Sequence, residues 1–217
     1  TVIAADDLSE GDFLVFATRL GEAKRTPLRL FTSIRSNGIR AMDLEAGDEL
    51  VSVVKADDGA DVILVTEQGK AIRFETTRLT SRSRAAGGVR GIRLLNDDHV
   101  VGAEIVQPEK QLFVITENGY GKRTPSESYP MTDRGGQGVI TLKAGSRLTG
   151  LVVGIAVVDP EQELMLISKN GVVNRTTLME IRAVGRSTQG VIVMRLEPGD
   201  KVAALAAFDK SEKPDAT

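Results

Sequence analysis

The sequence predicts an all-β, propeller-like fold of four blades, each with four antiparallel strands. Glycine-centred turns recur at Gly21, Gly69, Gly119 and Gly171. A second set of glycines recurs with spacings of 50, 50 and 52 residues, at Gly38, Gly88, Gly138 and Gly190. A repeat of about 50 residues in an all-β pattern is typical of propeller blades. No segment shows a strong amphipathic helical pattern, so the repeats are expected to be built from strands alone.

Each repeat begins with the signature of a β-hairpin. Short apolar runs occupy residues 13–18, 62–66, 112–116 and 164–168. They are rich in Val, Ile, Leu and Phe, the composition of a strand covered on both faces. Asn-Gly at 118–119 and 170–171 tolerates the positive φ that a type I′ hairpin turn requires. Gln-Gly at 68–69 and Leu-Gly at 20–21 are weaker versions of this signal.

The rest of each repeat completes the expected blade. The second strands, at 23–26, 70–74, 120–124 and 172–176, place their Arg opposite to their apolar residues. A polar connection then leads to a third strand, for example 89–94. The fourth strands are expected at 50–55, 100–106, 151–158 and 202–208. The strongest helical signal, at 177–182, predicts one turn at most.

These elements give the expected organisation of the chain as one domain. The blades are predicted at residues 13–56, 62–108, 111–158 and 163–208. Residues 1–5 are predicted to be the end of a preceding blade, and 209–217 a disordered tail, because that segment is polar and contains proline. The chain opens on TVIAA without an initiating Met, which indicates an excised fragment or a processed product.

Charge is distributed unevenly along the repeats. The formal net charge is −2, yet windows 19–40, 69–93, 119–143 and 171–195 hold 21 of the 28 Lys and Arg. The same windows hold only 5 of the 30 Asp and Glu. A feature that recurs at one repeat phase recurs on one side of the assembled molecule. An acidic protein can therefore present a concentrated basic track to a polyanion.

Catalytic and metal-binding residues are not predicted. His99 is the only histidine, so neither a catalytic triad nor a metal site is indicated, and no phosphate-binding P-loop is present. Asp57-Asp58 and Asp97-Asp98 are interpreted as turn residues. The absence of Cys favours a reducing compartment, most simply the cytoplasm. Since no apolar stretch approaches the roughly 20 residues of a membrane helix, no membrane partner is expected.

Three runs of sequence resemble a known family. They are NGYGKRT at 118–124, GVRGIRL at 88–94 and VGRSTQGVIVMRL at 184–196. They closely resemble the C-terminal domain of bacterial DNA gyrase A. The resemblance covers residues 1–208 approximately and corresponds to the last four blades of a six-bladed domain.

This resemblance implies a β-pinwheel, a propeller-like disc whose blades exchange strands and whose basic rim bends duplex DNA. The parent enzyme would be an ATP-dependent topoisomerase that introduces negative supercoils. Its ATP and Mg²⁺ would be bound by other domains, and its partners would be the remainder of gyrase A together with gyrase B. The family's signature heptad, Gln-Arg-Arg-Gly-Gly-Lys-Gly, is not in this chain. Its nearest echo is the run DRGGQG at 133–138.

The candidate DNA-binding residues are the basic side chains that recur on the second strands or near the second glycines. Such residues would grip phosphates and bend the duplex without reading bases. The set comprises Lys24, Arg25, Arg35, Arg40, Lys70, Arg73, Arg82, Arg84, Arg90, Lys122, Arg123, Arg134, Arg175, Arg182 and Arg186. A basic residue on an exposed strand can instead protect a sheet edge from aggregation.

Two other interpretations of the sequence stay open. The C-terminal domain of the C component of topoisomerase IV is also a basic pinwheel without the signature heptad. A propeller that binds protein partners, like WD40 or kelch domains, would belong to a different class. It would carry recurrent aromatic residues or Trp-Asp pairs, whereas this chain has no Trp and 4% aromatic residues.

Overall fold

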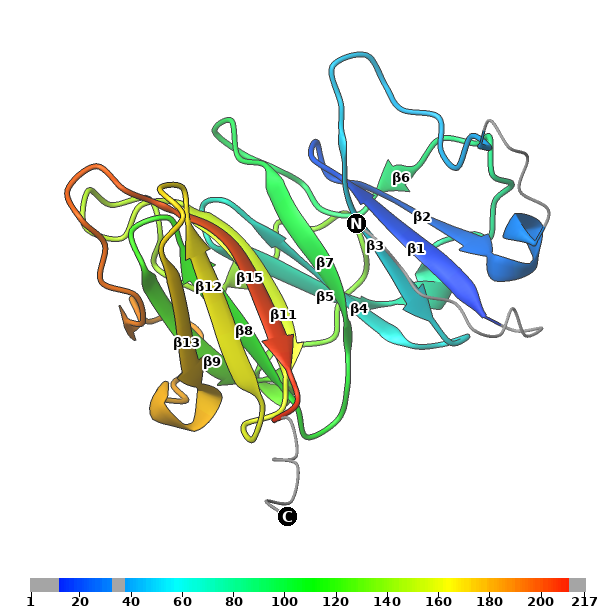
Figure 1. Cartoon of the computed structure of the whole chain (residues 1–217). Coiled ribbons are helices and arrows are strands. Elements are labelled where there is room, and N and C mark those ends of the chain that lie inside the picture. Colours follow the sequence, from blue (N-terminus) through cyan, green and yellow to red (C-terminus); the bar gives the residue numbers. More distant parts are fainter. Residues whose placement is uncertain (1–11, 33–37, 211–217) are drawn as a thin grey trace.

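The computed structural model describes residues 12–32 and 38–210. These residues form fifteen strands, arranged in four sheets, and four short 3-10 helices. The all-β, propeller-like fold is confirmed (Figure 1). The predicted strand at 1–5, Arg35 and most of the predicted tail lie outside the described residues.

Each repeat opens with the predicted hairpin. The pairs are β1 (Phe13–Thr18) with β2 (Glu22–Pro27), β4 (Asp61–Thr66) with β5 (Lys70–Glu75), β8 (Gln111–Thr116) with β9 (Tyr120–Pro125), and β12 (Glu163–Ser168) with β13 (Val173–Thr177). A single 3-10 turn follows each hairpin: η1 (Leu28–Phe31), η2 (Thr76–Arg78), η3 (Ser126–Ser128) and η4 (Leu178–Glu180).

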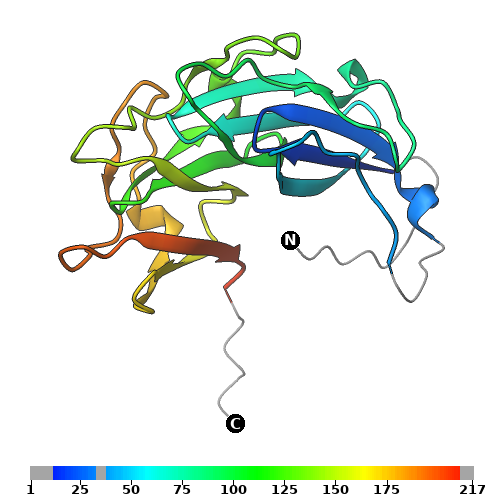
Figure 2. The same ribbon diagram turned by 90° about the horizontal axis from the view of Figure 1, so that it is seen from above.

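The last strand of each repeat pairs with the other side of the first strand. These strands are β3 (Leu50–Ala56), β7 (Val100–Val106), β11 (Val152–Val158) and β15 (Val202–Phe208). They contact one another in series, β3 with β7, β7 with β11 and β11 with β15. Seen from above, the four sheets follow one another around an open arc (Figure 2).

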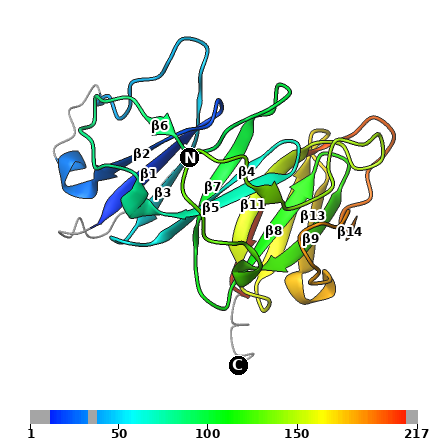
Figure 3. The same ribbon diagram turned by 180° about the vertical axis from the view of Figure 1, so that it is seen from behind.

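The third segment of a repeat does not join its own sheet. β6 (Val89–Arg90) pairs with β2, β10 (Val139–Ile140) with β5, and β14 (Val191–Ile192) with β9. Each of these two-residue strands is donated to the preceding sheet, as the view from behind shows (Figure 3). The strand expected at 89–94 is therefore shorter than predicted. The blade boundaries 62–108, 111–158 and 163–208 delimit sequence repeats rather than whole sheets.

The exchange leaves the four sheets unequal within the described residues. Three have four strands, whereas the sheet of β12, β13 and β15 has three. Apolar side chains of the hairpins and last strands form clusters that span neighbouring sheets. One cluster joins Val15 of β1 to Leu64 of β4, and another joins Phe113 of β8 to Leu166 of β12. The blades therefore share their cores.

Glycine at the hairpin turn is required by this exchange. At Gly69 (φ +78°) and Gly119 (φ +81°), a Cβ would lie 2.1 Å from the carbonyl oxygens of Leu142 and Met194, respectively. These carbonyls belong to the segments that follow β10 and β14. The donated segment crosses directly over the turn, so there is no room for a side chain. Gly171 has a similar φ of +83°, but nothing lies within 4 Å of its Cβ position.

We expect Gly119→Ala to destabilise the protein more than Gly171→Ala. Both substitutions place alanine in the left-handed region, at a cost of roughly 1–2 kcal/mol. Gly119→Ala also forces its Cβ against the Met194 carbonyl, and such overpacking adds about 1–3 kcal/mol. Urea unfolding of the two variants isolates the steric contribution, because the backbone strain cancels in the comparison. Equal losses would show that the donated segment moves aside freely.

Candidate nucleic-acid interface

The arginines that recur on the second strand of each hairpin bond to other groups of the chain, and those of the first three repeats are largely covered. In three repeats the arginine bonds to a side chain twelve positions before it, at the start of the preceding strand. Arg73 Nη2 lies 2.6 Å from Asp61 Oδ2, and Arg123 Nη1 lies 2.8 Å from Gln111 Oε1. Arg175 Nε lies 2.7 Å from Glu163 Oε2. Across the hairpin the register brings these pairs together.

In the first repeat the equivalent arginine, Arg25, contacts an aromatic ring and an aspartate instead. The guanidinium of Arg25 stacks over the ring of Phe13, 4.2 Å from its centroid, again twelve positions earlier. It also pairs with Asp58 through Nη1 and Oδ1 at 2.6 Å. Only 11% of the Arg25 side chain is exposed, so it presents little charge to solvent.

Two of these arginines also bind the next blade. Arg73 Nη1 donates to the carbonyl oxygens of Ser126 (3.0 Å) and Tyr129 (3.3 Å). Arg123 Nε donates to the carbonyl oxygen of Ile181 at 2.8 Å, and burial lowers the pKa of Arg123. Their guanidinium groups therefore link one blade to the next through hydrogen bonds, and we call such a residue a clasp between blades. In contrast, 54% of the Arg175 side chain is exposed, in the last of the four sheets.

Lys24 and Lys122 are also turned into the fold. Lys24 is 1% exposed, and its Nζ donates to the carbonyl oxygens of Ala41 (2.5 Å), Arg84 (2.8 Å) and Ala86 (3.1 Å). Burial, with a smaller contribution from the charge of Arg82, lowers the pKa of Lys24 to about 8. The side chain ties the loop before β6 to the first hairpin.

Lys122 occupies the equivalent place two blades further on. It is fully buried, and its Nζ donates to the carbonyl oxygens of Gly185 (2.7 Å) and Arg186 and to Thr188 Oγ1 (3.1 Å). Burial lowers its pKa to about 8 as well. Lys24 and Lys122 are candidate DNA-binding residues by sequence, but the alternation of the second strand turns their charged groups into the fold, towards the loop of the next repeat.

The remaining candidates lie nearer to the surface. Arg134 is exposed and is oriented by the carbonyl oxygens of Arg78 and Arg90, both at 3.0 Å. Arg186 Nη1 contacts the carbonyl oxygen of Ile140 at 3.4 Å. Arg40 pairs with Asp43 at 3.1 Å. Arg90 and Arg182 are exposed, and Lys70, Arg82 and Arg84 are half-buried.

Three further basic residues recur at one repeat phase, and the sequence reasoning missed them. Arg93, Lys143 and Arg195 each follow the second glycine of their repeat by five positions, and all three are exposed. Within the described residues, their charged groups have no hydrogen-bond or ion-pair partner. The signal was available, because aligning the repeats on their second glycine brings these three together. Asp43 stands at this phase in the first repeat.

The backbone places these residues equivalently. The amides of Asp43, Arg93 and Lys143 donate to carbonyl oxygens in the loop of the next repeat, at 3.2, 2.8 and 2.9 Å. The acceptors are Ala86, Gly136 and Thr188. The same backbone hydrogen bond, from one blade to the next, thus fixes the position of each of these charged residues.

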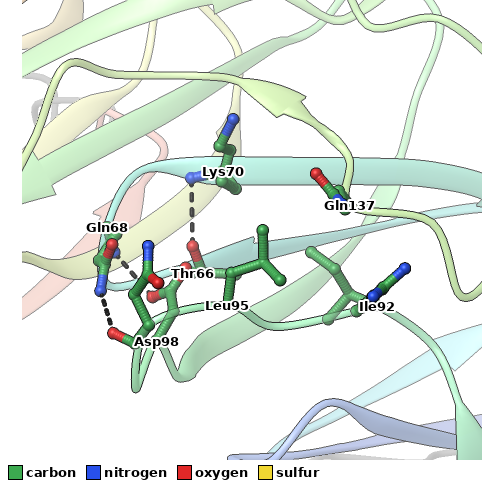
Figure 4. Close-up of a pocket in the computed structure, with 9 residues that line it drawn as sticks. Thr66, Gln68, Lys70, Ile92, Leu95, Asp98 and Gln137 are labelled. Atoms are coloured by element: carbon green, nitrogen blue, oxygen red, sulfur yellow. Dashed lines mark hydrogen bonds between the residues drawn. The ribbon is translucent and has the colours of Figure 1, made fainter.

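Lys70 and Arg93 line a small pocket of about 80 Å³ together with Gln137 (Figure 4). Asp98 also lines it, but its Oδ1 accepts the amide hydrogens of Gln68 and His99, both at 2.9 Å. Asp98 therefore has the expected turn role, but its side chain is buried rather than solvated.

Other candidate chemistry is sparse in residues 12–32 and 38–210. No group of three or more His, Cys, Asp or Glu side chains in these ranges is arranged to hold a metal ion. His99 Nδ1 lies 3.1 Å from Glu67 Oε2. Nowhere in the described part of the chain is there a helix long and apolar enough to cross a membrane.

Comparisons with known proteins agree with the fold. The family model for the DNA gyrase C-terminal domain, a beta-propeller, matches residues 4–57, 60–107, 110–159 and 162–209. DNA gyrase A of Dehalogenimonas lykanthroporepellens is 42% identical over 214 residues, 96% of this chain and 26% of that protein. DNA gyrase A of Staphylococcus epidermidis is 39% identical over 215 residues, 98% of this chain and 24% of that protein. The chain thus spans about a quarter of the length of these relatives.

Two solved structures are similar. The DNA gyrase A C-terminal domain matches with a TM-score of 0.86 and 25% identity, over 94% of this chain and 68% of that one. The C-terminal domain of DNA topoisomerase IV matches with a TM-score of 0.88 but 22% identity, over 95% and 65%, which is a likeness of fold alone. The sequence relatives at about 40% identity are gyrase proteins, and they decide between the two interpretations. The chain therefore belongs to the DNA gyrase C-terminal domain family of β-propellers.

Proposed function

We propose that this chain binds duplex DNA without sequence preference and bends it around its rim. The observation that carries the proposal is the recurrence of exposed, unpartnered Arg93, Lys143 and Arg195 at one phase of the repeat within the described residues. Exposed basic groups at regular intervals match the phosphate backbone, which is also regular and negatively charged. The half-buried and exposed arginines before the second glycines, Arg84, Arg134 and Arg186, would add to this track.

The curvature of the chain supports bending. The sheets follow an open arc, so contacts on successive blades lie on a curved line (Figure 2). Bending a few tens of base pairs costs on the order of 1–6 kcal/mol, which contacts on several blades can offset. Arg123, Lys24 and Lys122 are not included in the proposed contact set, because their charged groups are committed to the interior.

The parent protein is proposed to be the A component of a bacterial, ATP-dependent gyrase that introduces negative supercoils. Its partners would be the remainder of gyrase A together with gyrase B, in the cytoplasm. ATP and Mg²⁺ would act on other domains, as the family resemblance implies. This chain would contribute the DNA path and no covalent chemistry.

A salt titration on a duplex of about 40 base pairs tests the proposal, with energy transfer between the DNA ends as a second readout. We expect the logarithm of the association constant to fall linearly with the logarithm of salt concentration, with a slope of about −0.9 per phosphate contact. The ends should approach one another on binding. Binding without approach of the ends would contradict bending, and no binding in low salt would overturn the proposal.

A further inference from the structure

At each junction between successive blades, two residues of one repeat flank the loop that precedes the second glycine of the next repeat. One follows the hairpin-turn glycine, and the other lies five positions after the second glycine. At the junction of the first and second blades, a Cβ on Gly88 would lie 2.9 Å from Glu22 Cβ, and the Asp43 amide donates to Ala86. At the next junction, the Cβ of Gly138 would lie 2.3 Å from the carbonyl oxygen of Ala71, which follows Lys70, and the Arg93 amide donates to Gly136. We call these places the first and second seams.

The two seams are alike in backbone and differ in the charge of the two residues that flank the loop. Glu22 and Asp43 flank the loop at the first seam, and Lys70 and Arg93 flank it at the second. The third seam, where Lys143 donates its amide to Thr188, has Tyr120 at the position of Lys70. The acidic groups of the first seam have basic neighbours: Asp43 pairs with Arg40 at 3.1 Å, and Arg90 stands opposite Glu22 across the pair of β2 and β6. Burial raises the pKa of Glu22, and the charge of Glu45 raises it further, whereas the charge of Arg82 lowers it.

The second seam encloses the pocket of about 80 Å³ that Lys70, Arg93 and Gln137 line. Figure 4 shows the Lys70 side chain extending away from Asp98, whose carboxylate is bonded to backbone amides instead. Two cations and a carboxamide therefore share one concave place. Neither cation is neutralised by an ion pair within the described residues. Groups of this kind suit a tetrahedral oxyanion such as a phosphodiester.

We propose that the second seam binds one phosphate of the duplex through Lys70 and Arg93 together, whereas the first seam, with Glu22 and Asp43 at the same two positions, offers the backbone no such site. This inference rests on the proposed DNA binding. It adds that the blades contribute unequally.

The salt dependence of binding by a double variant of the intact chain tests whether the two cations share one phosphate. Lys70→Gln with Arg93→Gln should weaken duplex binding about tenfold in 0.1 M salt, the contribution of one phosphate contact. The salt slope should fall by about 1 in the double variant, because both side chains serve one contact. Two separate contacts would lower it by about 2. That result would overturn the shared site.

A gain of contact is the converse test. Glu22→Lys with Asp43→Arg gives the first seam the charges of the second. We expect binding about tenfold tighter in 0.1 M salt and a salt slope steeper by about 1. Unchanged binding of this variant would show that two cations at these positions do not make a phosphate site, which contradicts the proposal.

The control is Lys110→Gln with Lys210→Gln, because both lysines line one surface pocket with Asp159 and Asp209, away from the hairpin turns. This pair removes the same charge and should leave the salt slope unchanged. Circular dichroism and urea unfolding check the fold of each variant. If the unaltered chain does not bind DNA at all, the proposed function fails and the inference fails with it. If the chain binds and the Lys70 and Arg93 variants bind equally well, the inference alone is overturned.

Discussion

Replacing Arg123 by leucine is expected to lower the free energy of unfolding by about 3 kcal/mol, although the sequence presents this residue as a DNA-binding candidate. The side chain is 6% exposed and donates to the Ile181 carbonyl and to Gln111 Oε1, at 2.8 Å each. Removing it leaves the buried Ile181 carbonyl and the half-buried Gln111 side chain without a donor, and a buried acceptor left in this way costs about 1–3 kcal/mol. Urea unfolding followed by circular dichroism measures the loss.

Arg175→Leu is the matched control for this prediction. Arg175 stands at the same repeat position, but 54% of its side chain is exposed; it pairs with Glu163 and lies 5.3 Å from the centroid of the Phe208 ring. Because water reaches its guanidinium, the ion pair contributes about 1 kcal/mol, so this variant should lose less stability than Arg123→Leu. Equal destabilisation by the two substitutions would contradict the assignment of Arg123 as a clasp between blades.

The second large effect is expected on DNA affinity. Reversing the charge of Arg93, Lys143 and Arg195 together should weaken duplex binding by about 500-fold or more in 0.1 M salt, since roughly three phosphate contacts are lost. The salt slope should fall by about 3. All three side chains are exposed and unpartnered within the described residues, so the fold should be unaffected. Fluorescence anisotropy with a labelled duplex measures both quantities.

Reversing Lys110 and Lys210 provides the comparison, because it changes net charge away from the proposed track. An equal loss of affinity per substitution in this variant would mean that overall charge governs binding. An undiminished affinity of the triple variant would show that DNA follows another path across the protein.

The repeat period was sufficient to predict the fold class and the hairpins. Asn118-Gly119 and Asn170-Gly171 mark turns by local chemistry, because the positive φ is demanded within two residues. Which sheet the third segment of a repeat joins does not depend on its local sequence. A run such as 88–94 is compatible with a strand in either sheet, and only the assembled neighbours decide that β6 joins β2.

The candidate interface was harder to predict for a related reason. Arg73 alternates with apolar residues along its strand, a pattern that predicts an exposed side chain. In the structure the face it occupies is covered by the next blade, whose carbonyls at Ser126 and Tyr129 accept its hydrogen bonds. Alternation distinguishes two faces of a strand but does not say which is solvated. Arg93 and Lys143 lie after the short donated strands, where no alternation draws attention to them.

The exchange of β6, β10 and β14 has a consequence for how such a molecule can change length during evolution. A cut placed at the end of a sequence repeat would remove the strand that finishes the previous sheet and expose the turn glycine beneath it. A duplication or deletion of one whole repeat inside the array has no such cost, because the repeat that follows supplies the missing strand wherever the cut is placed. The number of blades can therefore change inside the array without loss of pairing, whereas a truncation at the C-terminal end leaves the last sheet one strand short.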